Sequence, residues 1–171
     1  MAQGDLVQRM LGAATLNIDT FEEVEADKTA TMQAAAVVAM VAVASAIGAS
    51  GGGAWSIIFA PVVQILGWLI WAGVTSFIGT KIFGGTADWG ELLRTLGFAQ
   101  SPGLLYLFAI LPLVGGIIRF VVPFWMLWAG IIAIRQALDF TTGKAVMTAV
   151  IGWLAMIIPA LILGGLFAFG G

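Results

Sequence analysis

Apolar and polar positions alternate in long blocks along this chain. Five blocks are almost free of charged side chains, at residues 31–47, 55–78, 96–114, 117–134 and 145–169. About 20 helical residues cross a hydrocarbon core of about 30 Å, so each block has roughly the length of a membrane span. A single helix from Gly103 to Ile134 would be about 48 Å long, so residues 111–116 are predicted to reverse the chain. The pattern predicts an all-α integral membrane bundle of five transmembrane helices.

The first 28 residues have a different pattern. They are rich in carboxylates, and Leu6, Val7, Met10 and Leu11 recur at helical spacing. A short helix with one apolar side suits the membrane surface. We therefore divide the chain into a cytoplasmic amphipathic segment, residues 1–28, and a five-span membrane domain, residues 29–171.

Composition and charge agree with a membrane protein and suggest its orientation. The chain is 61% hydrophobic and only 9% charged, whereas a soluble domain is about 25% charged. With five spans and a cytoplasmic N-terminus, six of the seven basic residues fall on the cytoplasmic side, and only Arg119 falls outside. Cytoplasmic loops carry an excess of Lys and Arg, so we expect the N-terminus inside and the C-terminus outside. A four-span chain would weaken this division, because Lys144 would change sides.

The chain contains no histidine and no cysteine. It therefore lacks the usual neutral-pH general base, thiol nucleophiles and the commonest zinc ligands. We expect a protein that is not an enzyme, without catalytic residues, a metal site or a cofactor. An enzymatic hypothesis would need catalysis by serine, threonine and interfacial carboxylates alone, and it lacks a convincing base.

Charged residues around the third and fifth predicted spans form a candidate cytoplasmic interaction surface. Its members are Asp88, Glu91 and Arg94 before the third span and Arg135, Asp139 and Lys144 in the next cytoplasmic loop. Glu91 and Arg94 are three residues apart, so on a helix they could form an ion pair. This group is either a docking surface for partners or a merely solvated rim, and exposed charge alone does not separate the two.

Three residues inside the predicted spans are candidate polar or hinge positions. An unpaired amide in hydrocarbon is costly, so Gln64 should find a partner on another helix or line a polar cavity. Pro61 and Pro102 should bend or kink their helices, because proline removes a backbone donor.

Short motifs carry a family resemblance. Phe21, Glu22 and Glu23 precede the first span, residues 96–102 read LGFAQSP, and residues 133–138 read AIRQAL before a small polar loop. In these motifs, and over about its whole length, the chain resembles the Yip family of Ypt/Rab-interacting membrane proteins. Eukaryotic relatives have a longer N-terminal region with an Asp-Leu-Tyr-Gly-Pro-like segment, whereas about 28 residues precede the first span here. The resemblance therefore implies a short bacterial-type member in the inner membrane, and GTPase binding is not carried over.

The main hypothesis is a non-enzymatic membrane protein that organises protein partners or lipids, and the resemblance implies membrane trafficking or organisation. Expected partners are the lipid bilayer, membrane or cytoplasmic proteins, and further copies of the chain, but no nucleic acid. Small residues four apart, such as Ala35 and Ala39, suit helix contacts within one bundle and between protomers alike. The alternative is a small transporter or channel subunit that uses Gln64 and the bends at Pro61 and Pro102.

Overall fold

The computed structural model describes residues 5–49 and 53–169, with side chains over 5–49 and 57–155, and consists of helices joined by short turns and loops. No strand occurs in these ranges, so the all-α prediction is confirmed. The elements are α1 (Leu6–Ala14), α2 (Ile18–Ala26), α3 (Ala30–Gly48), α4 (Gly53–Phe77), the π-helical turn η1 (Ile78–Ile82), α5 (Trp89–Phe98), the 3-10 helix η2 (Ser101–Ile110), α6 (Gly115–Ala137) and α7 (Thr142–Phe169).

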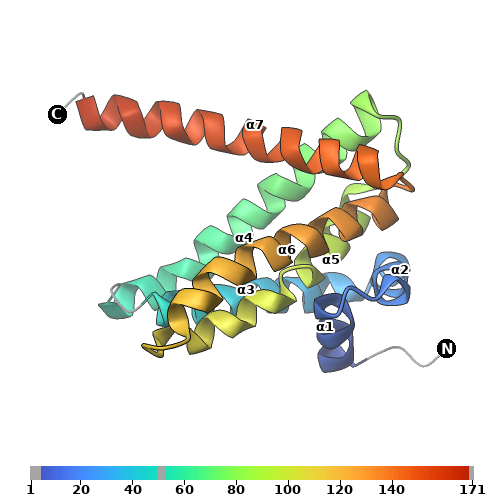
Figure 1. The fold of residues 1–171 in the computed structure, drawn as a ribbon. Coiled ribbons are helices and arrows are strands. Elements are labelled where there is room, and N and C mark those ends of the chain that lie inside the picture. The colour runs from blue at the N-terminus through green and yellow to red at the C-terminus, as the bar shows by residue number, and fades with distance from the viewer. Residues whose placement is uncertain (1–4, 50–52, 170–171) are drawn as a thin grey trace.

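Helices α3, α4 and α6 run lengthwise through the molecule, whereas α7 diverges from them toward the C-terminus (Figure 1). Three helical stretches of the described chain, 30–48, 57–82 and 115–137, are long and apolar enough to cross a membrane, and residues 142–155 form a shorter apolar helix. Helix α3 packs mainly against η2 and α4, while α6 packs mainly against η2 and α7. The protein is therefore an apolar helical bundle built for a bilayer. The count of five spans remains a prediction, and the C-terminal residues 170–171 lie outside the described part.

The third predicted span, 96–114, is wrong as a single helix. Helix α5 ends at Phe98, and η2 begins at Ser101. The ring of Pro102 would clash with the carbonyl of Phe98 in a continued α-helix, and proline has no N–H to donate. The Ser101 hydroxyl donates to that carbonyl instead, over 2.6 Å. The expected kink is thus a complete change of helix type.

Two other chain features match the sequence more closely. The predicted reversal at 111–116 is confirmed, because η2 ends at Ile110, α6 begins at Gly115, and the Gly115 N–H donates to the Leu111 carbonyl over 2.8 Å. Pro61 lies inside α4, which continues to Phe77, and the expected bend there stays a prediction. Membrane helices tolerate proline when neighbouring groups satisfy the freed backbone.

Close approach between α3 and the α5–η2 segment depends on glycine. A Cβ added at Gly97 would lie 2.7 Å from the Cβ of Ala34, and one added at Gly103 would lie 2.5 Å from Val41 Cγ1. Such distances are too short for any pair of side-chain carbons, so only glycine fits there. Small residues at helix contacts are typical of membrane proteins, because packing rather than hydrophobicity holds the helices together.

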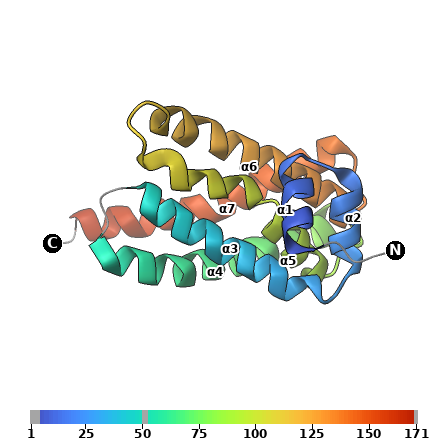
Figure 2. The same ribbon diagram turned by 90° about the horizontal axis from the view of Figure 1, so that it is seen from below.

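Helices α1 and α2 lie across one end of the long helices (Figure 1 and Figure 2). On α1, Arg9 and Ala13 are buried against the bundle, whereas Val7 and Leu11 are 56% and 62% exposed on the opposite face. The Trp125 indole N–H of α6 donates to the Ala14 carbonyl over 2.7 Å. An outward apolar face on a helix at the end of a membrane bundle suits the bilayer surface.

Candidate functional site

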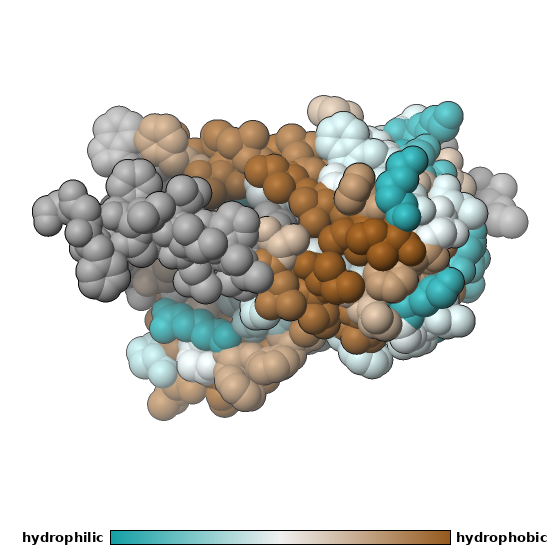
Figure 3. Space-filling model, turned by 90° about the horizontal axis from the view of Figure 1, so that it is seen from above, coloured by the Kyte–Doolittle hydropathy of each residue, from teal (hydrophilic) through white to brown (hydrophobic). Residues whose placement is uncertain are grey.

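Charge is confined almost entirely to one end of the bundle. All nine carboxylates and six of the seven basic side chains lie in residues 5–28, 81–94 and 135–144, which we call the charged end. Hydrogen bonds join its three segments: Gln136 to Glu22 over 2.9 Å, and Thr86 to Asp139 over 2.8 Å. Figure 3 shows hydrophilic residues gathered mainly at one end and hydrophobic residues over the middle. The remaining cation, Arg119, donates to the Gly48 carbonyl at the far end of α3.

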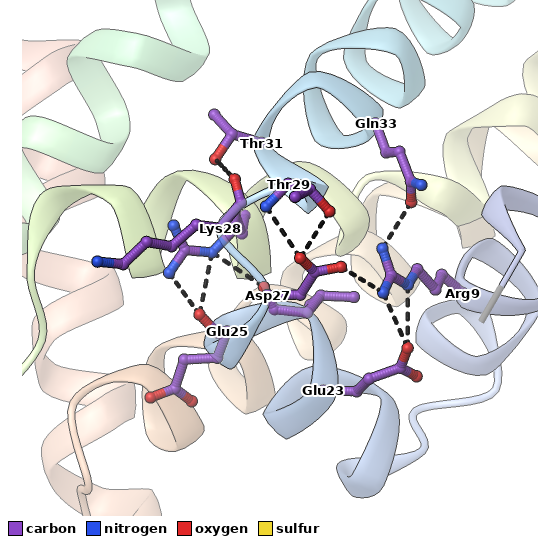
Figure 4. Close-up of polar contacts among 10 residues, drawn as sticks. Arg9, Glu23, Glu25, Asp27, Lys28, Thr29, Thr31 and Gln33 are labelled. Carbon is purple, nitrogen blue, oxygen red and sulfur yellow. Dashed lines mark hydrogen bonds and ion pairs between the residues drawn. The ribbon is translucent and has the colours of Figure 1, made fainter. Parts of the chain in front are cut away.

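Arg9 is the centre of the polar network at this end. Its side chain is 1% exposed, and its guanidinium donates to Glu23 over 2.9 Å, Asp27 over 2.6 Å and Gln33 over 2.8 Å (Figure 4). A buried cation needs such partners, because desolvation would otherwise cost several kcal/mol. These three partners come from α2, from the residue after it, and from α3. Arg9 therefore fixes α1 and α2 against the bundle.

A second buried arginine holds α2 from the other side. Arg94 of α5 is 4% exposed, and its Nε donates to the carbonyls of Val24 and Glu25, both over 3.0 Å. The last carbonyls of a helix have no partner within it and carry partial negative charge, so a cation is favourable there. Arg94 is therefore a structural clamp on the C-terminus of α2.

The prediction of an ion pair between Glu91 and Arg94 is wrong, because the described residues show no such pair. Glu91 and Asp88 instead form a reciprocal capping box at the start of α5. The Asp88 carboxylate accepts from the Glu91 N–H, and the Glu91 carboxylate accepts from the Asp88 N–H, each over 2.8 Å. Arg94 therefore does not belong to an exposed interaction surface, and Glu91 serves the helix start.

The network shifts two carboxyl groups in opposite directions. Hydrogen bonds from Thr29 and Arg9 lower the pKa of Asp27 to about 2. Burial, together with the negative charges of Glu91, Asp139 and Glu22, raises the pKa of Glu25 to about 7. The charged end therefore combines a firmly ionised carboxylate under Arg9 with one that changes charge near neutral pH.

The other predicted surface residues lie at the corner between α6 and α7. Asp139 is exposed with a φ of 54°, a conformation that aspartate tolerates better than most residues. The Lys144 ammonium donates to the Phe83 carbonyl over 3.3 Å and lies 5.3 Å from the centre of the Phe140 ring. Arg135 donates to the neighbouring Gln136 over 3.0 Å. The structure thus brings these three residues to the same end as Asp88 and Glu91.

At the charged end, more basic than acidic side chains are fully buried, so the exposed side chains carry more negative than positive charge. The two arginines that face inward, Arg9 and Arg94, are nearly inaccessible. Five carboxylates remain exposed against three exposed lysines: Asp5, Asp19, Glu22, Asp88 and Asp139 against Lys28, Lys81 and Lys144. The accessible face is therefore an acidic rim, which we use as the name for those five carboxylates.

A cavity lies farther from this end, between α4, α6, α7 and the α5–η2 junction. Its volume is about 460 Å³, and its walls are mostly aromatic and aliphatic. The Gln64 side chain lines it, and its Nε2 donates to the side-chain Oε1 of Gln100 over 2.9 Å. Gln64 was expected to find a partner on another helix or to line a polar cavity, and its partner Gln100 lies in the turn between α5 and η2. Neither Pro61 nor Pro102 lines the cavity.

Sequence analysis missed Arg9 and Gln100. A usable signal existed for Arg9, because Glu23 and Asp27 are four residues apart and could hold a cation together. Gln100 lies at a junction of helices, where no periodicity marks the direction of a side chain. The partners of both residues are distant in the sequence, and only the fold brings them together.

Comparison with known proteins identifies the family. A model described as the Yip1 domain matches residues 16–164, from the turn after α1 into α7. No curated protein and no solved structure matches the chain. The match includes α2, α5 and the cavity walls and covers most of the sequence, as the short motifs suggested. The chain therefore belongs to the Yip1 domain family.

Proposed function

We propose that this protein is a non-enzymatic organiser of the membrane, which recruits protein partners through the acidic rim. The observation that supports the proposal is the unequal burial of charge at one end. Arg9 and Arg94 are buried and bonded to groups inside the structure, while the five rim carboxylates are exposed. Their side chains come from the N-cap of α1, from α2, from the N-cap of α5 and from the α6–α7 corner. A partner could therefore touch several elements at once.

In the proposed topology, α3, α4, the α5–η2 segment, α6 and α7 make five crossings of a bacterial inner membrane. The 3-10 helix η2 has ten residues and rises only about 20 Å, so it needs α5 to complete a crossing. The charged end faces the cytoplasm, because six of the seven basic residues are there. The acidic rim is then open to cytoplasmic proteins and to cytoplasmic segments of membrane proteins.

The preferred partner chemistry is a basic segment. Charge complementarity steers encounter and rejects wrong partners, although each exposed pair contributes little affinity. An acidic rim is also repelled by anionic lipid headgroups, so a protein ligand suits it better than the surface of an anionic leaflet. Lys- or Arg-rich segments of neighbouring membrane proteins have the required charge.

The test neutralises two rim carboxylates without removing their structural hydrogen bonds. Glu22→Gln can still accept from Gln136, and Asp139→Asn can still accept from Thr86 and tolerates the positive φ. Two rim pairs at about 0.5–1 kcal/mol each predict about fivefold to thirtyfold weaker binding. The full-length chain is isolated in native nanodiscs, and crosslinked partners are quantified by mass spectrometry at low and high salt.

The matched control removes the same number of charges from exposed lysines of the charged end, with Lys28→Gln and Lys81→Gln, and should not lower the recovery of basic partners. We expect Glu22→Gln with Asp139→Asn to lower recovery of partners whose crosslinked segments are basic, and high salt to do the same in the wild type. Recovery that is unchanged by both the double substitution and salt would refute a role for the acidic rim.

A transporter or channel subunit is the second candidate, and the Gln64–Gln100 pair is the observation in its favour. Amide groups can line a path for a polar solute, whereas charged groups are not needed for neutral cargo. Solute flux into liposomes that Gln64→Leu abolishes would support this function over recruitment. Flux indistinguishable from that of empty liposomes would exclude it.

A further inference from the structure

The cavity between α4, α6, α7 and the α5–η2 junction has the size of a ligand site. Its volume of about 460 Å³ lies within the range of about 300–1,000 Å³ that is usual for small-molecule pockets. Trp68, Trp71, Tyr106, Met126 and Trp153 are among the residues that line it, and no charged side chain does so in the described part of the chain. An occupant of this space must be neutral and largely apolar.

Gln64 and Gln100 supply the only carboxamide groups in the lining formed by the described residues. Together they have four N–H donors and two oxygens, and one donor and one oxygen site are used in the 2.9 Å bond between Gln64 and Gln100. That bond is the only side-chain hydrogen bond of either residue among the described residues. Unused amide groups in an apolar medium are costly, so an occupant with an oxygen atom would be favoured here.

Two glycines keep the cavity open. Gly67 on α4 and Gly130 on α6 line opposite walls, and a Cβ added to either would meet nothing within 4 Å. This contrasts with Gly97, where an added Cβ would lie 2.7 Å from Ala34. Helix packing requires glycine at Gly97, but it does not require glycine at Gly67 or Gly130. Glycine at these two positions instead enlarges the empty space.

The depth of the amides narrows the class of occupant. Gln64 is eleven residues after the start of α4, or about 16 Å along the helix, so with the start of α4 at the membrane boundary it lies deep within a hydrocarbon core of about 30 Å. The headgroups of ordinary phospholipids lie outside that core, too far from this depth for a hydrogen bond. A molecule that reaches the amides must carry its oxygen into the bilayer interior.

We propose that the cavity binds one neutral long-chain lipid that carries a hydroxyl or ketone oxygen, with the oxygen at the Gln64–Gln100 pair and the chain against the aromatic walls. The lipid enters from the bilayer, because the walls are formed by the apolar helices α4 and α6. This site is separate from the acidic rim, so neither proposal depends on the other.

The test uses two photoreactive probes, hexadecanol and hexadecane, each with a diazirine on the chain. The full-length protein is reconstituted in vesicles of phosphatidylethanolamine and phosphatidylglycerol, and labelled peptides are identified by mass spectrometry. One hydrogen bond of about 1 kcal/mol predicts about fivefold more labelling of the cavity walls by the alcohol than by the alkane. Excess unlabelled hexadecanol should compete for the same labelling.

Two variants, one on each wall, are used so that the test still holds if one of them fails to fold. Gly67→Leu and Gly130→Leu should each fill the space and remove the labelling, whereas Gly116→Leu, an exposed position where an added Cβ also meets nothing, should not. Replacing Gln64 and Gln100 together by Leu should lower alcohol labelling to the alkane level. Equal labelling by both probes in the wild type, or labelling that persists in both wall variants, would overturn the proposal.

Discussion

Arg9→Met should release α1 from the bundle while the membrane-spanning helices stay folded. The substitution keeps a side chain of similar length but removes the hydrogen bonds to Glu23, Asp27 and Gln33. Breaking a buried ion pair by removing one partner costs about 3–5 kcal/mol. Glu23 is 39% exposed and can be rehydrated, whereas Asp27 is 11% exposed. The lower value, about 3 kcal/mol, is therefore expected.

The measurement is amide hydrogen exchange of α1 in nanodiscs. A loss of about 3 kcal/mol in the free energy of local opening predicts roughly 150-fold faster exchange for amides that exchange through detachment of α1. Amides of α6 away from Trp125 serve as the internal reference. Arg9→Lys keeps the charge but loses the forked geometry, so its effect should be smaller.

A double-mutant cycle separates the ion pair from simple loss of packing. If Asp27 and Arg9 stabilise one another, Asp27→Asn should add much less to Arg9→Met than it costs alone. Unchanged exchange of α1 in Arg9→Met, or fully additive effects of the two substitutions, would refute the role assigned to Arg9.

Two further predictions concern packing and pH. Gly97→Ala should lower the free energy of unfolding in detergent by about 1–3 kcal/mol, because the new Cβ would lie 2.7 Å from the Cβ of Ala34. Adding Ala34→Gly should restore part of this loss, and the absence of any rescue would contradict the contact between these two positions. Glu25 has a folded-state pKa of about 7, above its ordinary value of 4.5, so the unfolded chain loses this proton first and stability falls as pH rises from about 4.5 to 7. Glu25→Gln should therefore show a smaller drop in Tm between pH 5 and pH 8 than the wild type, and an equal drop would argue against a raised pKa of the half-buried Glu25 carboxyl.

Several elements could be predicted from the sequence because the responsible interactions are local. Apolar length alone predicted helices close to α3, α4 and α6, and glycine and proline at 111–116 predicted the reversal before α6. The spacing of Leu6 to Leu11 predicted an amphipathic N-terminal helix, now seen as α1 with Val7 and Leu11 outward. The side-chain period of a helix is fixed by its geometry, so these features need no knowledge of the fold.

At residues 96–114, apolar length predicted one helix, but the proline within this segment breaks it. The residues 96–114 are apolar enough for a span, and a kink at Pro102 was expected. The structure has a full break there, because Ser101 satisfies the Phe98 carbonyl that proline would obstruct, and η2 then packs between α3 and α6. A proline does not always end a helix, since α4 continues past Pro61.

Length, hydropathy and charge count are properties of the chain, so they were enough to predict an apolar helical bundle with nearly all of its charge in three segments. The roles of the polar groups instead depend on how the helices pack. The buried Arg94 donates to two carbonyls of α2 that lie 69 and 70 residues away in the sequence. Gln64 forms a hydrogen bond with Gln100, which is 36 residues away. Helix periodicity gives the face of each side chain but not the neighbour opposite that face. That neighbour is set by how the helices pack.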